Sequence, residues 1–202
     1  MMIKNIIFDV GDVLIEYRWK SMMRDYGLSE EEATRIGLEI FDSPYWPLLD
    51  YGTILEEEAA EGLSKIYPAD ADVIRWFLSH GEYMRVLRPD VYERVFALKK
   101  AGYRLYILSN YCKGLFEKHT EGAPFLKEMD GMLISYMVHM NKPEHRIYEE
   151  LLRRFDLRAQ ECLFFDDRPE NVQGAKECGL EAITVTSRQM LIDQLDALLQ
   201  KQ

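Results

Sequence analysis

The chain has 202 residues, 48% of them hydrophobic, which is enough for one substantial core or for a core with a small cap. A formal net charge of −10 repels nucleic acid and anionic membranes, so neither is expected as a partner. Three widely spaced cysteines without a CxxC pair argue against a disulfide framework and against a zinc site.

Five short apolar runs predict the buried strands of a parallel sheet, because each is rich in Ile, Leu, Val, Phe or Tyr without strict alternation. They lie at 5–10, 104–110, 131–136, 162–167 and 181–186. The run at 5–10 is too short for a signal peptide or a membrane span, which favours a cytoplasmic protein. Helical patterns at 89–102, 143–156 and 169–180 alternate with these runs, as in an open α/β sheet with right-handed crossovers.

One interval breaks this alternation. Residues 16–85 show helical patterns at 29–41 and 53–67 but no strong strand pattern. The first of these patterns begins with Ser29 and has Glu32 three residues later, which is the spacing of a capping box. The chain is therefore expected to leave the sheet after its first strand and to build a helical insert.

These patterns together predict an α/β fold with a three-layer, Rossmann-like core around a parallel sheet. The core is expected from residues 1–15 and 87–202, and a helical cap from residues 16–86. A cap inserted after the first strand would cover the sheet edge and exclude water from a small substrate.

Polar residues stand where the predicted strands end. An aspartate after an apolar run is often only a turn former, and a Ser-Asn pair can simply cap a helix. Two adjacent carboxylates after a buried run, however, repel each other unless a cation lies between them. Ligand sites of open α/β sheets lie beyond the C-terminal strand ends, so the residues there are expected to form one site. They are Asp9, Ser109, Asn110, Asp166 and Asp167. Lys142 joins them from the segment that enters the helix after the third run.

This set suits phosphoryl transfer. Asp9, Asp166 and Asp167 are expected to bind Mg²⁺, a hard cation that prefers oxygen ligands. Asp9 is also the candidate nucleophile, forming an aspartyl-phosphate that water hydrolyses. Lys142 and the Ser109 hydroxyl would stabilise charge on the oxygens of the phosphoryl group.

Two asparagines complete the predicted site. Backbone N–H groups around Asn110 would add hydrogen bonds to the bound phosphate. Asn171, one helical turn beyond the acid pair, would orient that pair by hydrogen bonding. The expected partner is therefore a small phosphorylated metabolite, bound by a monomer or a homodimer.

The motifs in order resemble those of the haloacid dehalogenase superfamily. They are FDVGDVL at 8–14, LSN at 108–110, Lys142-Pro143 and FFDD at 164–167. Within the superfamily the chain is similar to small bacterial phosphatases of sugar phosphates such as α-D-glucose 1-phosphate. It is also similar to the N-terminal phosphatase domain of soluble epoxide hydrolase. The resemblance covers the whole chain and implies a cap after the first motif, a Mg²⁺ cofactor and hydrolysis of phosphate monoesters.

The first motif departs from the pattern of these phosphatases at Gly11. The family usually has an aspartate there, which protonates the leaving oxygen and later activates water, while its backbone carbonyl binds the metal. Gly11 retains the carbonyl but lacks the acid/base group, which typically contributes about 10²–10⁴-fold to the rate. Asp12, one place further on, could replace that group, although a role in turning the backbone is favoured.

Two alternatives to a phosphatase stay open for this reason. The superfamily's dehalogenases also lack the second aspartate and use their nucleophile on carbon. They normally carry a Ser-Ser-Asn type of fourth motif, so the pair Asp166-Asp167 speaks against dehalogenation. The other alternative is a weakly active or non-catalytic member that binds a phosphorylated metabolite.

The predicted cap offers candidate contacts to the substrate. Arg18 suits an anion, and the aromatic faces of Trp19, Tyr45 and Trp46 suit a sugar. The same residue types commonly pack a cap onto a core, which is the simpler interpretation. The four histidines show no metal-ligand spacing and are assigned no role.

Overall fold

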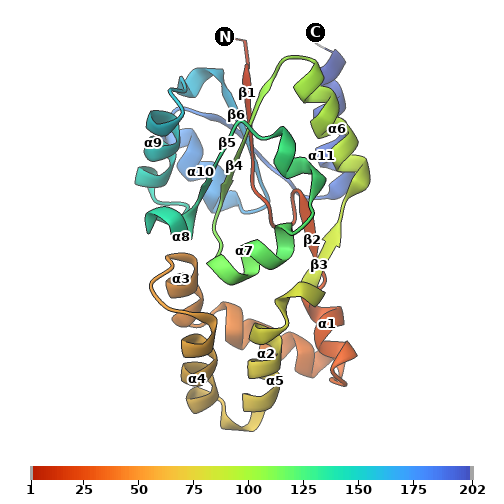
Figure 1. Ribbon diagram of the computed structural model, residues 1–202, viewed down its shortest axis with the longest axis vertical. Helices are drawn as coiled ribbons and strands as arrows, with labels where there is room; N and C mark the ends of the chain where they lie inside the picture. The colour runs from red at the N-terminus through yellow and green to blue at the C-terminus, as the bar shows by residue number, and fades with distance from the viewer. Residues whose placement is uncertain (1, 201–202) are drawn as a thin grey trace.

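Figure 1 shows the computed structural model of the chain, which describes residues 2–200. Its centre is a five-stranded sheet in the order β5–β4–β1–β6–β7, with all neighbouring strands parallel. The strands are β1 (Asn5–Phe8), β4 (Arg104–Ser109), β5 (Gly131–Ile134), β6 (Cys162–Asp166) and β7 (Glu181–Thr184). Each strand lies within one of the five predicted apolar runs, so the predicted parallel sheet is confirmed.

Side chains of the central strands alternate between two apolar cores, one on each face of the sheet. On one face Ile6 and Phe165 belong to a core that also contains residues of α6 and α11. On the other face Ile7 and Phe164 pack with residues of α9 and α10. These helices are α6 (Pro89–Lys100), α9 (His145–Arg154), α10 (Pro169–Glu177) and α11 (Arg188–Gln200). The predicted three-layer α/β architecture is therefore confirmed (Figure 1).

Two helices of the core begin at the predicted prolines, whereas α9 begins at His145, two residues after the predicted start at 143. Pro89 and Pro169 each occupy the first turn of their helix, where the missing N–H costs nothing. The remaining short elements of the core are α7 (Lys113–Thr120), η3 (Pro124–Glu128), α8 (Ser135–Val138) and η4 (Ala159–Glu161). In the described part of the chain, no helix has the length and apolar character that crossing a membrane requires.

A second group of helices lies beyond one end of the sheet (Figure 1). Its members are α1 (Trp19–Asp25), α2 (Glu30–Phe41), α3 (Tyr45–Asp50), α4 (Glu56–Ile66), η1 (Pro68–Asp70), α5 (Ala71–Ser79) and η2 (Gly81–Met84). The predicted capping box is confirmed, because the Ser29 side chain and the Glu32 side chain each bond the other's backbone N–H. We propose that residues 16–86 form the cap and that 1–15 with 87–202 form the core; residues 1, 201 and 202 lie outside the described part.

The expectation that this interval lacks strands needs correction at its two ends. Strands β2 (Ile15–Tyr17) and β3 (Arg85–Leu87) pair antiparallel and join the helical group to the core. Each has only three residues, so no alternating pattern is long enough to be recognised in the sequence. The pair nevertheless matters, because it places Tyr17 beside the end of β1.

Candidate active site

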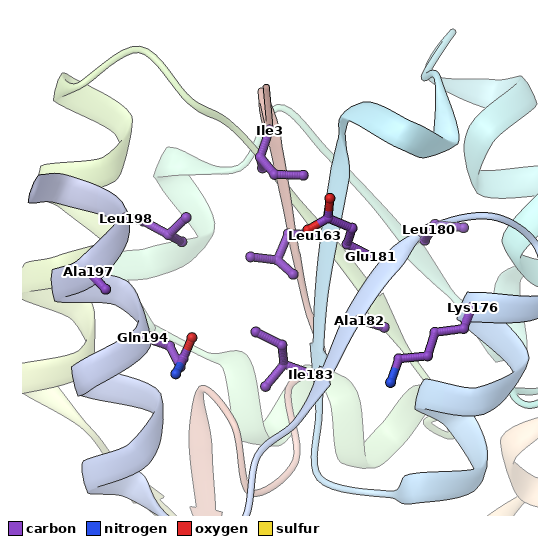
Figure 2. A pocket seen from close by; sticks show the side chains of 10 residues that line it. All are labelled: Ile3, Leu163, Lys176, Leu180, Glu181, Ala182, Ile183, Gln194, Ala197 and Leu198. Atoms are coloured by element: carbon purple, nitrogen blue, oxygen red, sulfur yellow. The ribbon is translucent and has the colours of Figure 1, made fainter. Parts of the chain in front are cut away.

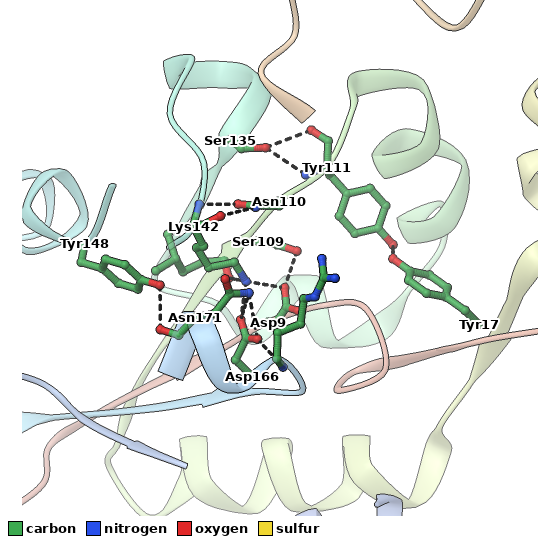
Figure 3. A network of polar contacts seen from close by, with 12 residues as sticks. Asp9, Tyr17, Ser109, Asn110, Tyr111, Ser135, Lys142, Tyr148, Asp166 and Asn171 are labelled. Carbon is green, nitrogen blue, oxygen red and sulfur yellow. Dashed lines mark hydrogen bonds and ion pairs between the residues drawn. The ribbon is translucent and has the colours of Figure 1, made fainter. Parts of the chain in front are cut away.

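Three aspartates meet at the C-terminal edge of the sheet. Figure 3 shows two of them, Asp9 and Asp166. Asp9 follows β1, Asp166 ends β6 and Asp167 comes directly after it. One carboxylate oxygen from each of the three lies within 4.8 Å of the others. The parallel pairing of β1 with β6 brings them together, because strand ends in register share one edge.

Lys142 lies between two of these carboxylates. Its Nζ is 2.9 Å from Oδ1 of Asp9 and 2.5 Å from Oδ2 of Asp166, and it donates to the Leu108 carbonyl at 3.0 Å. The ammonium is almost fully buried, so water screens these ion pairs very little. The Ser109 hydroxyl donates to the same Asp9 oxygen at 2.6 Å, which fixes the carboxylate from two sides.

The site carries more negative charge than its single ammonium offsets. Burial raises the pKa of Asp9 to about 6, although Lys142 opposes the rise. Burial, together with repulsion from Asp9 and Asp166, raises the pKa of Asp167 to about 7. Burial lowers the pKa of Lys142, but the two carboxylates raise it more, so the lysine stays charged. Three clustered carboxylates with this excess of charge fit a hard divalent cation such as Mg²⁺.

The two predicted asparagines hold the site in shape. The Asn171 amide donates to both oxygens of Asp166, at 3.0 and 3.2 Å, as its predicted orienting role requires. The Asn110 side chain exchanges two hydrogen bonds with the backbone of Lys142, at 2.8 and 2.9 Å. Asn110 thus fixes the loop that carries the lysine.

A cavity of about 360 Å³ opens above the carboxylates, between the core and the helical group. Its lining contains Asp9, Lys142 and Asp167, whereas Ser109 and Asp166 lie outside the lining and contact Asp9 and Lys142 instead. The other lining residues are Gly11, Asp12, Tyr17, Trp19, Leu38, Phe41, Asp42, Trp46, Asp50, Met84, Asn110, Tyr111, Cys112, Leu115, His119, Arg168 and Asn171.

A larger cavity, of about 440 Å³, lies beside strand β7 and helix α11 (Figure 2). Its lining is mainly apolar and offers one lysine, Lys176, and one carboxylate, Glu181. It shares no described residue with the cavity above Asp9. Because a reaction needs several convergent polar groups, the smaller cavity is the candidate active site.

The loop after β1 explains why position 11 is a glycine. A Cβ atom on Gly11 would lie 2.7 Å from Cε2 of Tyr17 and 2.8 Å from its hydroxyl oxygen. The neighbouring Asp12 has a positive φ of 50°, and its Oδ1 accepts a hydrogen bond from the Tyr17 N–H at 3.1 Å. Asp12 therefore turns the backbone, as favoured from the sequence, while its side chain also borders the cavity.

The predicted contacts of the helical group divide into two sets. Trp19 and Trp46 line the cavity. Arg18 is outside the lining: its guanidinium pairs with Asp25 and donates to the Tyr83 carbonyl at 3.2 Å. In this arrangement the charge of Arg18 is paired with an exposed carboxylate, and its contact with the substrate anion stays a prediction. Tyr45 lies against Gly62 of α4 and is also outside the lining.

Asp50 is a cavity residue that the sequence did not reveal. It ends α3 in the helical group, and its backbone carbonyl accepts a hydrogen bond from the Ser135 hydroxyl of the core at 2.6 Å. Burial raises the pKa of Asp50 to about 7, with Lys142 lowering it and Asp9 raising it. No spacing in the sequence could have shown this, because the residue reaches the site only through the docking of α3 on the core.

A family model for haloacid dehalogenase-like hydrolases matches residues 3–179. The sesquiterpene phosphatase astK of Aspergillus oryzae is 27% identical over 186 residues, covering 91% of this chain and 90% of that protein. D-ribitol-5-phosphate phosphatase of Bacteroides thetaiotaomicron is 24% identical over 191 residues, covering 89% and 90%. Drimenol cyclase drtB of Aspergillus calidoustus is 27% identical over 188 residues, which are 90% of this chain and only 34% of that protein.

A similar fold is found among solved structures. A haloacid dehalogenase family enzyme of Bacteroides thetaiotaomicron, solved in complex with magnesium and inorganic phosphate, matches with a TM-score of 0.69. The match covers 90% of this chain and 93% of that one at 21% identity, so it shows a shared fold.

Proposed function

The chain belongs to the haloacid dehalogenase-like hydrolases, and we propose that it is a Mg²⁺-dependent phosphatase that works through an aspartyl-phosphate on Asp9. The expected hydrolysis of phosphate monoesters agrees with the phosphatases among its relatives. The proposal rests on one observation above all: three carboxylates lie within 4.8 Å of one another, beside a buried lysine. A cytoplasmic location stays a prediction.

In the proposed reaction an oxygen of Asp9 forms a bond to phosphorus while the bond to the leaving oxygen breaks. Lys142 and Ser109, both bonded to Oδ1 of Asp9, hold the carboxylate in one orientation before the substrate arrives. When bound by Asp9, Asp166, Asp167 and the Gly11 carbonyl, Mg²⁺ supplies positive charge that offsets repulsion between carboxylate and phosphate. Water then attacks the aspartyl-phosphate, which releases inorganic phosphate and regenerates the Asp9 carboxylate.

The acid cluster also bears on the dehalogenase alternative. A nucleophile that attacks carbon gains nothing from two further carboxylates, which would repel a haloacid anion unless a cation were bound. The raised pKa of Asp167, caused by burial and by Asp9 and Asp166, indicates a site that needs added positive charge. Phosphoryl transfer uses that charge, whereas haloacid hydrolysis has no need of it.

We infer further that the leaving group of the substrate is apolar or aromatic. The helical group lines the cavity mainly with apolar surface, from Trp19, Leu38, Phe41, Trp46 and Met84. Among the described residues, its charged contributions to the lining are both carboxylates and no lysine or arginine is included. A sugar or polyol would need hydrogen-bond partners there, while an apolar group gains from burial against such a surface. A relative that is named as a sesquiterpene phosphatase agrees with this inference.

The test is phosphate release from a panel that pairs apolar phosphates, such as geranyl and aryl phosphates, with D-ribitol 5-phosphate and α-D-glucose 1-phosphate. Each is assayed with Mg²⁺, with chelator and with the Asp9→Asn variant. We expect chelator-sensitive release that the variant lacks, with the apolar phosphates preferred. Chelator-insensitive turnover of a haloacid would support the dehalogenase instead, and phosphate binding without release would indicate a non-catalytic member.

A further inference from the structure

Tyr17 occupies the space that a side chain at position 11 would need. Its ring and hydroxyl come within 2.8 Å of the place where a Cβ on Gly11 would stand. Tyr17 also lines the cavity together with Asp9. The tyrosine comes from β2 rather than from the loop after β1, so the hydroxyl enters this space from a different element. Gly11 and Tyr17 are therefore complementary: the small residue makes room for the large one.

The Tyr17 hydroxyl is the first member of a chain of hydrogen bonds. It bonds the hydroxyl of Tyr111, as Figure 3 shows. The Tyr111 hydroxyl in turn lies 2.9 Å from Nδ1 of His119, and Nε2 of His119 lies 2.8 Å from the carbonyl oxygen of Gly81. Tyr111 and His119 are buried, so solvent does not compete for these bonds.

The last member fixes the direction of the whole chain. A carbonyl oxygen only accepts, so Nε2 of His119 must carry the hydrogen that faces Gly81. Burial lowers the pKa of His119 to about 4, so the imidazole is neutral at pH 7 and its Nδ1 is an acceptor. Tyr111 therefore donates to Nδ1, and Tyr17 must donate to Tyr111. The lone pairs of the Tyr17 oxygen are left free to accept a hydrogen bond at the cavity.

We propose that Tyr17 replaces the missing side chain at Gly11 by accepting a hydrogen bond from the water that attacks the Asp9 aspartyl-phosphate. Tyr111 and His119 are positioning residues, because they hold the Tyr17 hydrogen away from the cavity. The proposal rests on the proposed phosphatase function and deepens it. It explains how a chain without the usual acid at position 11 orients water for the second half of the reaction.

The step balances without any change in the charge of Tyr17. The oxygen of water forms a bond to phosphorus, and the bond between phosphorus and the Asp9 oxygen breaks. The electron pair of that bond returns to Asp9 as a carboxylate, and both hydrogens of the water leave with inorganic phosphate. Tyr17 keeps its own proton throughout, so the tyrosine orients the water and is not its base.

The test separates the two half-reactions by rapid-quench kinetics with p-nitrophenyl phosphate and Mg²⁺. The burst of nitrophenol reports formation of the phosphoenzyme, and the steady-state rate reports its hydrolysis when that step is slow. Tyr17→Phe keeps the ring over Gly11 and removes only the hydroxyl. We expect steady-state turnover to fall about tenfold, the value of one neutral hydrogen bond, while the burst rate stays within about threefold of wild type. The fraction of protein trapped as phosphoenzyme rises accordingly.

Two further variants serve as a second test and as a control. Tyr111→Phe keeps the Tyr17 hydroxyl but removes its acceptor, so phosphoenzyme should again accumulate, by a smaller factor. Tyr83→Phe, on an exposed tyrosine of η2, should change neither phase. If Tyr17→Phe folds poorly, the accumulation in Tyr111→Phe decides alone.

The outcomes distinguish this inference from the proposed function. Unchanged steady-state turnover in both Tyr17→Phe and Tyr111→Phe would overturn the role of Tyr17 and leave the phosphatase intact. An equal slowing of burst and steady state would also overturn it, since a general loss of structure affects both phases. Absence of any phosphoenzyme that depends on Asp9 in the wild-type protein would overturn the proposed function and this inference together.

Discussion

The floor and the roof of the active-site cavity differ in polarity: the floor is charged, and the roof is mainly apolar. The floor consists of Asp9, Lys142 and Asp167 at the sheet edge. The buried Lys142 pairs there with Asp9 and with Asp166, which lies outside the lining, at 2.9 and 2.5 Å. The roof, from the helical group, presents mainly aromatic and aliphatic side chains. The floor can be precise because parallel strands fix its side chains, whereas the roof only needs to present a surface of the right polarity.

This difference assigns different tasks to the two regions. A buried charge loses much of its interaction energy when it moves, so the chemistry belongs on the rigid sheet. Apolar contacts are weaker individually and tolerate movement, so selection of the leaving group belongs on the helices. Variants of the floor should therefore affect all substrates alike, and variants of the roof should change the ranking among them.

The largest effect is expected from Lys142→Met. Loss of the ammonium removes charge stabilisation from the phosphoryl group, and we expect kcat to fall about 10³-fold on every substrate. The change also leaves Asp9 and Asp166 without their cation, which should lower the metal-free free energy of unfolding by about 3–5 kcal/mol. Kinetics on the substrate panel and urea unfolding with chelator measure both.

The matched control for that variant is Lys99→Met. Lys99 forms an ion pair with Asp130 at 2.7 Å, but both side chains are about one-third exposed. Such a pair contributes about 0–1 kcal/mol, so this variant should retain stability and full activity. An equal loss in the two variants would contradict the special role of the buried lysine.

The next largest effect concerns the metal. Asp167→Asn removes one of three clustered carboxylates, so the Mg²⁺ concentration for half-maximal activity should rise about 10²-fold. A Mg²⁺ titration of phosphate release measures this shift. Asp196→Asn, on the surface helix α11, should leave the titration unchanged. An Asp167 variant with an unaltered Mg²⁺ requirement would remove this carboxylate from the metal site.

Asp50 couples roof and floor through charge. Burial raises the pKa of Asp50 from an ordinary value of 3.8 to about 7. Between pH 3.8 and pH 7 the folded state therefore binds more protons than the unfolded state. The free energy of unfolding therefore falls as the pH rises through that window. Asp50→Asn should remove this loss and stabilise the metal-free protein at pH 8 relative to pH 4. Urea unfolding of both proteins at the two pH values with chelator provides the check; parallel pH dependences would contradict it.

The smallest expected effect lies in the roof. Trp46→Ala removes an aromatic surface from the cavity, so the ratio of kcat/KM for aryl phosphate over D-ribitol 5-phosphate should fall about tenfold. Leu48→Ala, on the same helix α3 but outside the lining, should not change this ratio. A loss shared equally by both substrates would mean that Trp46 supports the fold and not the selection.

The floor could be predicted because its signals are local. Each buried run ends in its own polar residue, and the rule that parallel strands share a C-terminal edge brings Asp9, Ser109 and Asp166 together. The structure places them within hydrogen-bonding or ion-pairing distance of one another or of Lys142. The structure adds hydrogen bonds that the sequence does not show: the Asn110 side chain bonds the backbone of Lys142, and Ser109 bonds Asp9. Their roles in binding phosphate stay predictions.

The roof could not be predicted to the same depth, because it depends on which way helices and short strands turn. Arg18 and Trp19 are adjacent in the sequence, yet Trp19 alone lines the cavity while Arg18 pairs with Asp25. Tyr17 and His119 come from distant segments and meet through Tyr111. Nothing in the local sequence of either residue indicates that meeting.

The most direct test of the central claim is to identify the residue that carries the phosphoryl group during turnover. The protein is quenched in acid while it hydrolyses p-nitrophenyl phosphate with Mg²⁺, and borohydride then reduces any aspartyl-phosphate to homoserine. Peptide mass spectrometry should find homoserine at Asp9, and chelator should abolish it. Homoserine at Asp12, or phosphate release without any such adduct, would contradict the account.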